Sequence, residues 1–384
     1  MSVFLLVLGL LLFVGLVIIH EFGHFLVARR NGVTVEEFGI GFPPRAWMRK
    51  IKDKKGGFEF SINWLPIGGF VKLKGESDAA TAKGSLGAAT TWSKTKIMLA
   101  GVTMNLVVAF GLFTVLAWVG MPKLLDNQLT VSSDTKVLRQ EVLAGYVENG
   151  SPADKSGLKA RDKLVSIASV SDSEHVLAIK SASDLPDITK SLGGEKVIIS
   201  YERRGQDYTT TATLRSDKEV ESSSKTSKPK GYLGVSPTEY TLTRSTWSAP
   251  VVAVGLIGQF TAATFQGLGS AVGAIFQGDG ARAAENVSGP VGIIVLLKDG
   301  SLLGIQFILM IIAIISLTLA IMNVLPIPAL DGGRLYMVLL SRLSLRLGGK
   351  PMSQEMEERI VGASFLFLMF LIVLITIVDV RRFF

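Results

Sequence analysis

The pentapeptide His20-Glu21-Phe22-Gly23-His24 ends an apolar run that extends from Val3 to Ile19. In a helix, the two imidazoles of an H-E-x-x-H motif lie one turn apart on the same face. This spacing suits two ligands of a tetrahedral zinc ion, and Glu21 lies beside them as a candidate general base. Ionisable side chains on a membrane-length helix are costly and usually functional. Because two of the chain's three histidines fall in this pentapeptide, the stretch predicts a metal site within a membrane helix.

The composition indicates a membrane protein with an additional polar region. The chain has 384 residues, 48% of them hydrophobic and only 19% charged, and its net charge is +8. The positive charge fits cytoplasmic loops near anionic lipid better than nucleic-acid binding, because no basic patch is interleaved with aromatic residues. Cysteine is absent, so any metal must be held by His, Asp or Glu.

Hydropathy predicts about four transmembrane helices, at 3–29, 97–121, 301–325 and 360–378. The first run lacks a basic start and a small-residue cleavage site, which favours a retained helix over a signal peptide. The basic segments 31–96 and 334–359 predict cytoplasmic loops and place both termini outside the cytoplasm. The moderately apolar segment 247–276 could span the membrane or lie at its interface. We favour the interface, because another span would put the next motif on the wrong side.

The loop after the first helix contains a strand signal. Residues 58–64 alternate apolar and polar side chains, and 66–73 resemble a turn into a second strand. Such a β-hairpin beside a membrane site could offer its edge to an extended peptide. The alternative is a small cytoplasmic hairpin that makes no substrate contact.

Residues 122–240 are polar and contain a distinctive pattern. A strand, a Gly-Ser-Pro-Ala helix start at 150–153, a Gly-Leu stop at 157–158 and a second strand follow one another. This order resembles a PDZ domain, a fold that binds extended peptides by strand addition. His175 lies in this region, where a solvated surface histidine is the expected state.

A second decisive stretch, from Asn323 to Arg334, reads NVLPIPALDGGR. Its prolines and glycines break a membrane helix, and irregular backbone at membrane depth is tolerated only within protein or beside a watery cavity. Asp331 is a natural third zinc ligand that leaves one position for water, and its alternative role is to cap the helix that follows. Asn323 could donate to a developing oxyanion or could hold the broken helix. For Gly101 and Asn105, on the second membrane helix, we favour helix packing.

Together, HEFGH, Leu330-Asp331-Gly332 and the PDZ-like insert resemble the site-2 protease family of intramembrane zinc metalloproteases, of the bacterial regulator of sigma-E protease type. The resemblance implies Zn2+ held by His20, His24 and Asp331, with Glu21 as general base and Asn323 assisting substrate or transition-state binding. It also implies that the hairpin pairs with substrate at the membrane through Gly68, Gly69, Phe70 and Val71. Two departures are Val102, where relatives often have Pro, and room for a single PDZ domain.

The predicted fold is a polytopic α-helical membrane protein with a membrane-associated β-hairpin and an inserted α+β PDZ domain. Residues 1–121 would hold two membrane helices and the hairpin, 122–240 an extracytoplasmic PDZ domain, and 241–384 the interfacial helix and the remaining spans. The predicted location is the bacterial inner membrane. The predicted partners are the lipid bilayer, single-span proteins such as an anti-sigma factor or a signal-peptide remnant, and peptide C-termini or unfolded segments at the PDZ domain. No nucleic acid is expected.

Two rival functions come from other classes. A membrane PDZ scaffold with a structural zinc would need a fourth protein ligand, for which His175 is the candidate. A metal-dependent transporter is disfavoured because Glu21, between two ligands, has no evident role in ion passage.

Overall fold

Two units make up the part of the chain that the computed structural model describes, residues 2–53, 56–76, 80, 82–224, 229–280, 288–348 and 352–383. The helical unit comprises residues 1–121, 128–131 and 246–384. The sheet unit comprises 122–127 and 132–245. We describe each unit by itself.

Five described helices are long and apolar enough to cross a membrane. They are α1 (Ser2–Arg30), α2 (Thr91–Val119), α6 (Ala249–Phe276), α9 (Ile305–Val324) and α11 (Gln354–Phe383). Four of them coincide with the predicted spans. The fifth, α6, is the segment for which the sequence leaves a span and an interfacial helix open.

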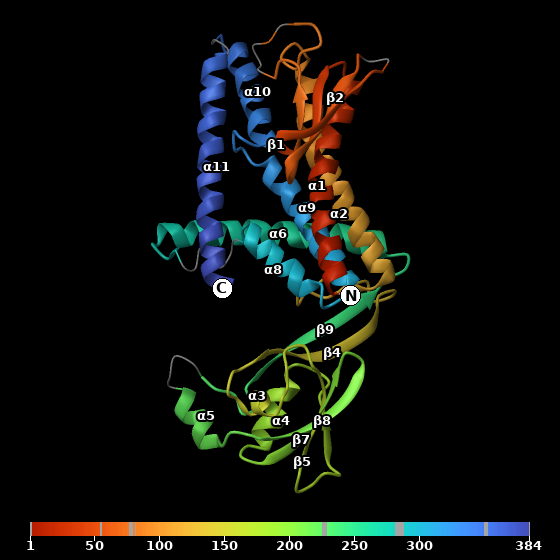
Figure 1. The fold of residues 1–384 in the computed structure, drawn as a ribbon, viewed down its shortest axis with the longest axis vertical. Coiled ribbons are helices and arrows are strands. Elements are labelled where there is room, and N and C mark those ends of the chain that lie inside the picture. Colours follow the sequence, from red (N-terminus) through yellow and green to blue (C-terminus); the bar gives the residue numbers. More distant parts are fainter. Residues whose placement is uncertain are drawn as a thin grey trace. The chain divides into compact units, whose positions relative to one another are not determined.

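Helix α2 packs between its neighbours in the helical unit. Phe113 of α2 stacks on Phe260 of α6 with ring centroids 5.8 Å apart, and both rings are buried. Figure 1 shows α6 lying across the direction of α1 and α2. A shorter helix, α8 (Pro290–Gly300), contributes Leu297 to an apolar cluster with α1 and α9. Apolar contacts thus join α2 to α6 and join α8 to α1 and α9.

The segment between α1 and α2 forms two long strands, β1 (Val35–Ile51) and β2 (Phe58–Leu73), which pair with each other. The predicted hairpin within 58–73 is wrong, because both of its arms belong to β2 and pair with β1. Residues 37–40 have partners in 59–62 and also in 69–72, so they lie between the two arms. Gly39, Gly41, Pro43 and Pro44 weaken the strand signal of β1, which explains the error.

The β1–β2 sheet packs directly on the helices that carry the HEFGH motif and its neighbours. Its buried contacts with α1 and α2 are made by Ala28, Val35, Leu73, Ile97 and Met98. The far end of the sheet leaves large apolar side chains exposed, including Phe42, Trp47 and Trp64. Exposed aromatic residues of this kind are typical of a membrane interface.

The sheet unit is built on a seven-stranded sheet in the order β3-β9-β4-β5-β7-β8, with β6 paired to β5. The strands are β3 (Met121–Pro122), β4 (Lys136–Val147), β5 (Lys163–Ser169), β6 (Val176–Ala178), β7 (Lys196–Arg203), β8 (Gln206–Thr213) and β9 (Val235–Arg244). Three short helices accompany it: α3 (Pro152–Lys155), α4 (Asp184–Ser191) and α5 (Asp217–Ser224). The strand–helix–strand order expected at 144–167 is present as β4, α3 and β5, and the PDZ assignment stays a prediction.

An ion pair fastens the turn before β5 to β7. Asp162 is 2% exposed and receives hydrogen bonds from Arg203 at 2.7 Å (Nε) and 2.6 Å (Nη2). Removing the guanidinium leaves a buried carboxylate without its cation, which typically costs about 3–5 kcal/mol. We therefore expect Arg203→Leu to lower the free energy of unfolding of the sheet unit by about 3 kcal/mol. Hydrogen-exchange mass spectrometry of peptides from this unit measures the loss. Lys218→Leu, at an exposed position, is the control, and equal exchange in the two variants would contradict the expectation.

Candidate metal centre

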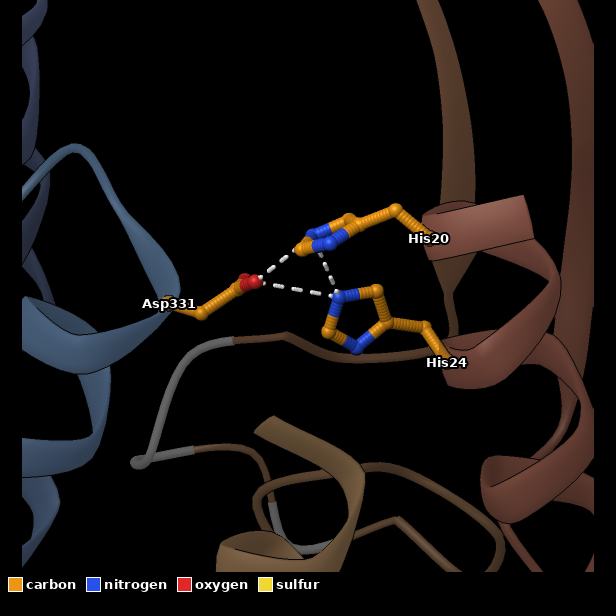
Figure 2. A group of neighbouring side chains, drawn as sticks. All are labelled: His20, His24 and Asp331. Atoms are coloured by element: carbon orange, nitrogen blue, oxygen red, sulfur yellow. Dashed lines mark hydrogen bonds and ion pairs between the residues drawn. The ribbon is translucent and has the colours of Figure 1, made fainter. Parts of the chain in front are cut away.

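Three side chains from distant parts of the chain meet at one point of the helical unit. His20 and His24 project from α1, and Asp331 is the first residue of α10 (Asp331–Arg346). The Asp331 Oδ2 atom lies 3.0 Å from His20 Nε2 and 3.1 Å from His24 Nε2. The two Nε2 atoms are 3.2 Å apart, and Figure 2 shows all three groups pointing toward one another.

These three atoms fit the donor set of a zinc ion. Zinc binds imidazole nitrogen and carboxylate oxygen at about 2.0–2.1 Å, so tetrahedral donors lie about 3.3 Å from one another. The separations of 3.0–3.2 Å are within a few tenths of an ångström of that value. Both imidazoles are buried, and the ligating atoms of the trio all lie within 4.8 Å of one another. The group can therefore hold one metal ion without rearrangement of the backbone.

Helix α2 orients both imidazole rings. His24 Nδ1 lies 2.8 Å from the carbonyl oxygen of Ile97 and donates to it. His20 Nδ1 lies 3.2 Å from the side-chain amide of Asn105, which is fully buried. A ligating histidine needs such a partner on its second nitrogen, because that hydrogen bond fixes the tautomer and directs the other lone pair to the metal.

The role of His20 as a ligand sets the orientation of the Asn105 amide. Nε2 can bind a metal only when it is unprotonated, so Nδ1 must carry the proton and face an acceptor, which here is the amide oxygen of Asn105. Exchanging amide nitrogen and oxygen leaves the shape of the side chain unchanged. The oxygen then accepts the proton of Nδ1, which leaves Nε2 of His20 unprotonated toward Asp331. The sequence favours helix packing for Asn105, and the only signal for its contact with His20 is a buried amide on a membrane helix.

Gly101 provides the space in which the two rings meet. A Cβ atom on Gly101 would lie 2.5 Å from Nε2 of both His20 and His24, closer than any van der Waals contact allows. We expect Gly101→Ala to weaken zinc binding by at least about tenfold, because one or both rings must move. Competition with a chromophoric zinc chelator measures the affinity. Gly111→Ala is the matched control on the same helix, since a Cβ there meets nothing within 4 Å. Equal zinc affinity in the two variants would show that the rings do not need this space.

Asp331 is positioned by a sharp reversal of the chain after α9. Helix α9 ends at Val324, and α10 begins seven residues later in sequence at Asp331. Cβ atoms on Gly332 and Gly333 would lie 2.4 Å from the Val324 oxygen and 2.1 Å from the Ile327 oxygen. Only glycine allows this approach, which explains the Asp-Gly-Gly sequence. The capping position of α10 is Leu330, and no side chain caps it, so the helix-cap role for Asp331 is not observed.

Asn323 lies on the last turn of α9. Its side-chain amide donates to the carbonyl oxygen of Leu319 at 3.0 Å. Asn323 is not among the residues that line the cavity beside the three ligand candidates. This contact lies within α9, and both predicted roles of Asn323 stay predictions.

A cavity of about 180 Å3 opens beside the three ligand candidates, and its lining includes Glu21, His24, Phe70, Val71 and Asp331. Glu21 accepts a hydrogen bond from the backbone N–H of Val71. Its Cγ atom lies 3.4 Å from the place where a Cβ on Gly69 would be. Glu21, two of the ligand candidates and part of the second arm of β2 thus line one cavity. That arm contributes Phe70 and Val71, and their contact with substrate stays a prediction. Gly68 and Gly69 directly precede Phe70 on β2 and are absent from that lining.

The second arm of β2 forms an edge of the sheet. Among the described residues, 69–72 pair only with β1. The N–H groups of a strand alternate between its two sides, and Lys74 N–H donates toward β1 at Thr34. The N–H groups of Val71 and Leu73 therefore face the other side, where Glu21 and Glu76 accept them.

Membrane-length helices, three candidate metal donors and the nearby carboxylate of Glu21 together define the class of this protein as a membrane metalloprotease. The chain belongs to peptidase family M50, whose profile matches residues 8–371. A protein of Clostridium acetobutylicum, provisionally named a zinc metalloprotease, is 31% identical over 392 residues, which cover 99% of this chain and 98% of the relative.

Two further relatives carry more specific names. Zinc metalloprotease RasP of Shouchella clausii is 26% identical, with 97% of this chain and 98% of the relative covered. Regulator of sigma-E protease RseP of Salmonella typhimurium is 25% identical, with 93% of each chain covered. The resemblance to the site-2 protease family is confirmed. The chain is a zinc-dependent metalloprotease. It is a bacterial membrane protein, and its family acts by intramembrane proteolysis. An enzyme is therefore favoured over a scaffold or a transporter.

Proposed function

We propose that this protease hydrolyses peptide bonds within or near the apolar segment of single-span membrane proteins. The observation that carries this proposal is that Glu21 lines one cavity together with His24 and Asp331, two members of the trio of ligand candidates. The cavity lies in the unit that contains the membrane-length helices. A substrate bond that is cut in this cavity must reach the level of the HEFGH motif on the membrane-length helix α1. Anti-sigma factors and signal-peptide remnants are substrates of the required kind.

Each polar side chain of the centre has a proposed role. His20, His24 and Asp331 would hold the zinc, with Asn105 and the Ile97 carbonyl fixing the two imidazoles. Zinc, when bound, supplies a Lewis acid that polarises a carbonyl and makes water more acidic. Glu21 accepts the proton of the attacking water and returns it to the leaving amine nitrogen. The hydrogen bond from Val71 N–H holds the Glu21 carboxylate toward the cavity.

The edge of β2 is the proposed binding site for the unwound substrate. A helical substrate hides its carbonyl groups in hydrogen bonds, so it must become extended before hydrolysis. An extended segment can pair with the outward N–H and C=O groups of 69–73, and this pairing offsets part of the cost of unwinding. Gly68, Gly69, Phe70 and Val71 would then contact the residues around the scissile bond.

The remaining assignments follow the charge distribution and the family. We place the basic segments 31–96 and 334–359 in the cytoplasm and the sheet unit outside it. The sheet unit would act as a PDZ domain that excludes bulky extracytoplasmic domains or binds C-termini and unfolded segments. His175 is exposed there, as expected of a surface histidine. The orientation of α6 across its neighbours (Figure 1) supports an interfacial helix, and Asn323 would stabilise the end of α9.

Purified protein in proteoliposomes with a single-span reporter tests the proposal. We expect the wild type to cut the reporter, a strong zinc chelator to stop cleavage, and added zinc to restore it. Cleavage that continues after the bound zinc has been removed would contradict the proposed role of the metal.

A further inference from the structure

The cavity of about 180 Å3 beside Glu21, hereafter the catalytic cavity, adjoins a larger cavity of about 820 Å3. The larger cavity lies between the end of β2 and the first half of α11. Leu73, Glu76 and Arg334 line both cavities. These three residues therefore form the boundary between the cavities, and a chain that extends along the edge of β2 must pass them.

Glu76 covers part of the edge of β2. One of its carboxylate oxygens accepts the outward N–H of Leu73 at 3.0 Å, so this donor is already occupied. Charged side chains are a common means of protecting a strand edge from unwanted pairing. Since Glu21 accepts the N–H of Val71, a carboxylate holds each of the two outward N–H groups in this part of the edge.

The backbone next to Glu76 is fixed by main-chain hydrogen bonds. The N–H groups of Leu86 and Gly87 donate to the carbonyl oxygens of Lys74 and Gly75 at 2.8 and 3.1 Å. These bonds hold the chain where it leaves β2, so the end of the strand does not depend on the Glu76 side chain. The contact of that side chain with the strand edge therefore calls for another explanation.

Arg334 anchors the carboxylate of Glu76. Its Nη2 atom lies 3.0 Å from the second carboxylate oxygen, and it stands on the first turn of α10, three residues after Asp331. Figure 1 shows α10 beside the end of the helical unit that carries β1 and β2. The side chains of Arg334 and Glu76 are 29% and 37% exposed. Because water screens a pair with this exposure, its net stabilisation is small and a bound strand can displace it.

We propose that Glu76 and Arg334 form a displaceable cap on the substrate edge of β2. The inference rests on the proposed function, in which this edge pairs with the unwound substrate. Before substrate binds, the Glu76 carboxylate occupies the N–H of Leu73 at the boundary of the two cavities. When an extended segment binds, one of its carbonyl oxygens accepts that N–H, and the carboxylate keeps only its contact with Arg334.

The cap makes a main-chain carbonyl group the feature that admits a peptide to the edge. A segment that stays helical cannot supply this group, because its carbonyl oxygens already accept hydrogen bonds within the helix. It therefore leaves Glu76 on Leu73. An extended segment replaces the bond that it breaks, so Glu76 is a specificity-determining residue for unwound substrates.

The test measures binding of a single-span reporter to Glu21→Gln protein, which should hold the reporter without cutting it. We expect Glu76→Ala in this background to tighten binding about fivefold, because the reporter no longer competes with a carboxylate for the N–H of Leu73. Arg334→Gln should tighten binding by a smaller factor, since it removes only the anchor. Adding Arg334→Gln to Glu76→Ala should then have no further effect.

Glu36→Ala is the matched control. Glu36 also lines the larger cavity, but its carboxylate pairs with a side chain, that of Lys72, at 3.1 Å. Reporter affinity should therefore equal that of the parent protein. With Glu21 intact, Glu76→Ala should lower KM and leave kcat and zinc content unchanged, because the cap acts before the chemical step.

Hydrogen exchange reports on the cap directly. In the free protein, the peptide that contains Leu73 should exchange faster in Glu76→Ala than in the parent protein. Bound reporter should make the two exchange rates equal, because the substrate then protects the same N–H group. The Glu36→Ala control should match the parent protein with and without reporter.

Equal reporter affinity with and without Glu76→Ala would overturn the proposal. Cleavage of the same reporter by the wild type would then show that the cap is wrong and the proposed function stands. Tighter binding to Glu76→Ala protein, with no cleavage by the wild type, would support the cap and contradict the protease assignment for this reporter. A reporter that binds neither protein would contradict both the cap and the edge as a binding site.

Discussion

Replacing Glu21 by Gln is expected to slow cleavage by about a hundred- to ten-thousandfold while zinc stays bound, because a general base contributes on that scale. The amide keeps the size of the side chain and loses only the ability to accept and return a proton. The three ligand candidates, His20, His24 and Asp331, are untouched. Product formation by gel or mass spectrometry and metal content by elemental analysis measure the two effects.

The control for this variant is the exposed Glu355→Gln, which removes a carboxylate outside the catalytic cavity in the same helical unit. Its cleavage rate and zinc content should equal those of the wild type. Glu21→Gln protein that cleaves at a normal rate would show that another group moves the proton. Loss of zinc together with cleavage would show instead that Glu21 supports the metal site.

Replacing Asp331 by Asn is the substitution expected to have the second largest effect. The variant would present a neutral amide to the metal, and losing the only anionic donor of the trio should weaken zinc binding by more than about a hundredfold, beyond the effect of a supporting residue. Cleavage should fall in proportion to the zinc lost and recover partly at high zinc concentration. Isothermal titration with zinc and the reporter assay measure the two quantities.

Asp379→Asn is the matched control for Asp331→Asn. Asp379 is also buried on a helix of the same unit, but it accepts hydrogen bonds from the backbone N–H groups of Gly289 and Gly292 at 2.9 and 2.8 Å. The asparagine amide of this control still offers an oxygen to those donors, so zinc affinity should not change. Equal zinc affinity in Asp331→Asn and the wild type would exclude Asp331 as a ligand.

The spans and the ligand candidates could be predicted from the sequence because they depend on local signals. Membrane helices require about twenty apolar residues in a row, and an H-E-x-x-H motif fixes its own geometry within one helical turn. The ligand role of Asp331 could be predicted for a related reason. A carboxylate in a membrane segment that is interrupted by Pro and Gly is costly and usually functional.

The supporting contacts could not be predicted because they depend on which elements pack together. Gly101 and Asn105 have the same spacing as ordinary helix-packing residues, and only the approach of α1 to α2 places them against the imidazoles. The pairing of β2 is a similar case. In the sequence, residues 58–64 and 66–73 resemble the two strands of a hairpin. In the structure both pair with β1, whose glycines and prolines weaken its own strand signal.

The position of the cut bond tests the central claim most directly. The masses of the two products from a single-span reporter in proteoliposomes identify that bond. We expect it to lie within the reporter's apolar segment, and its cleavage to disappear in Glu21→Gln protein and after zinc removal. A bond cut only in the polar sequence beyond the bilayer, by wild type that holds its zinc, would contradict proteolysis at the depth of α1.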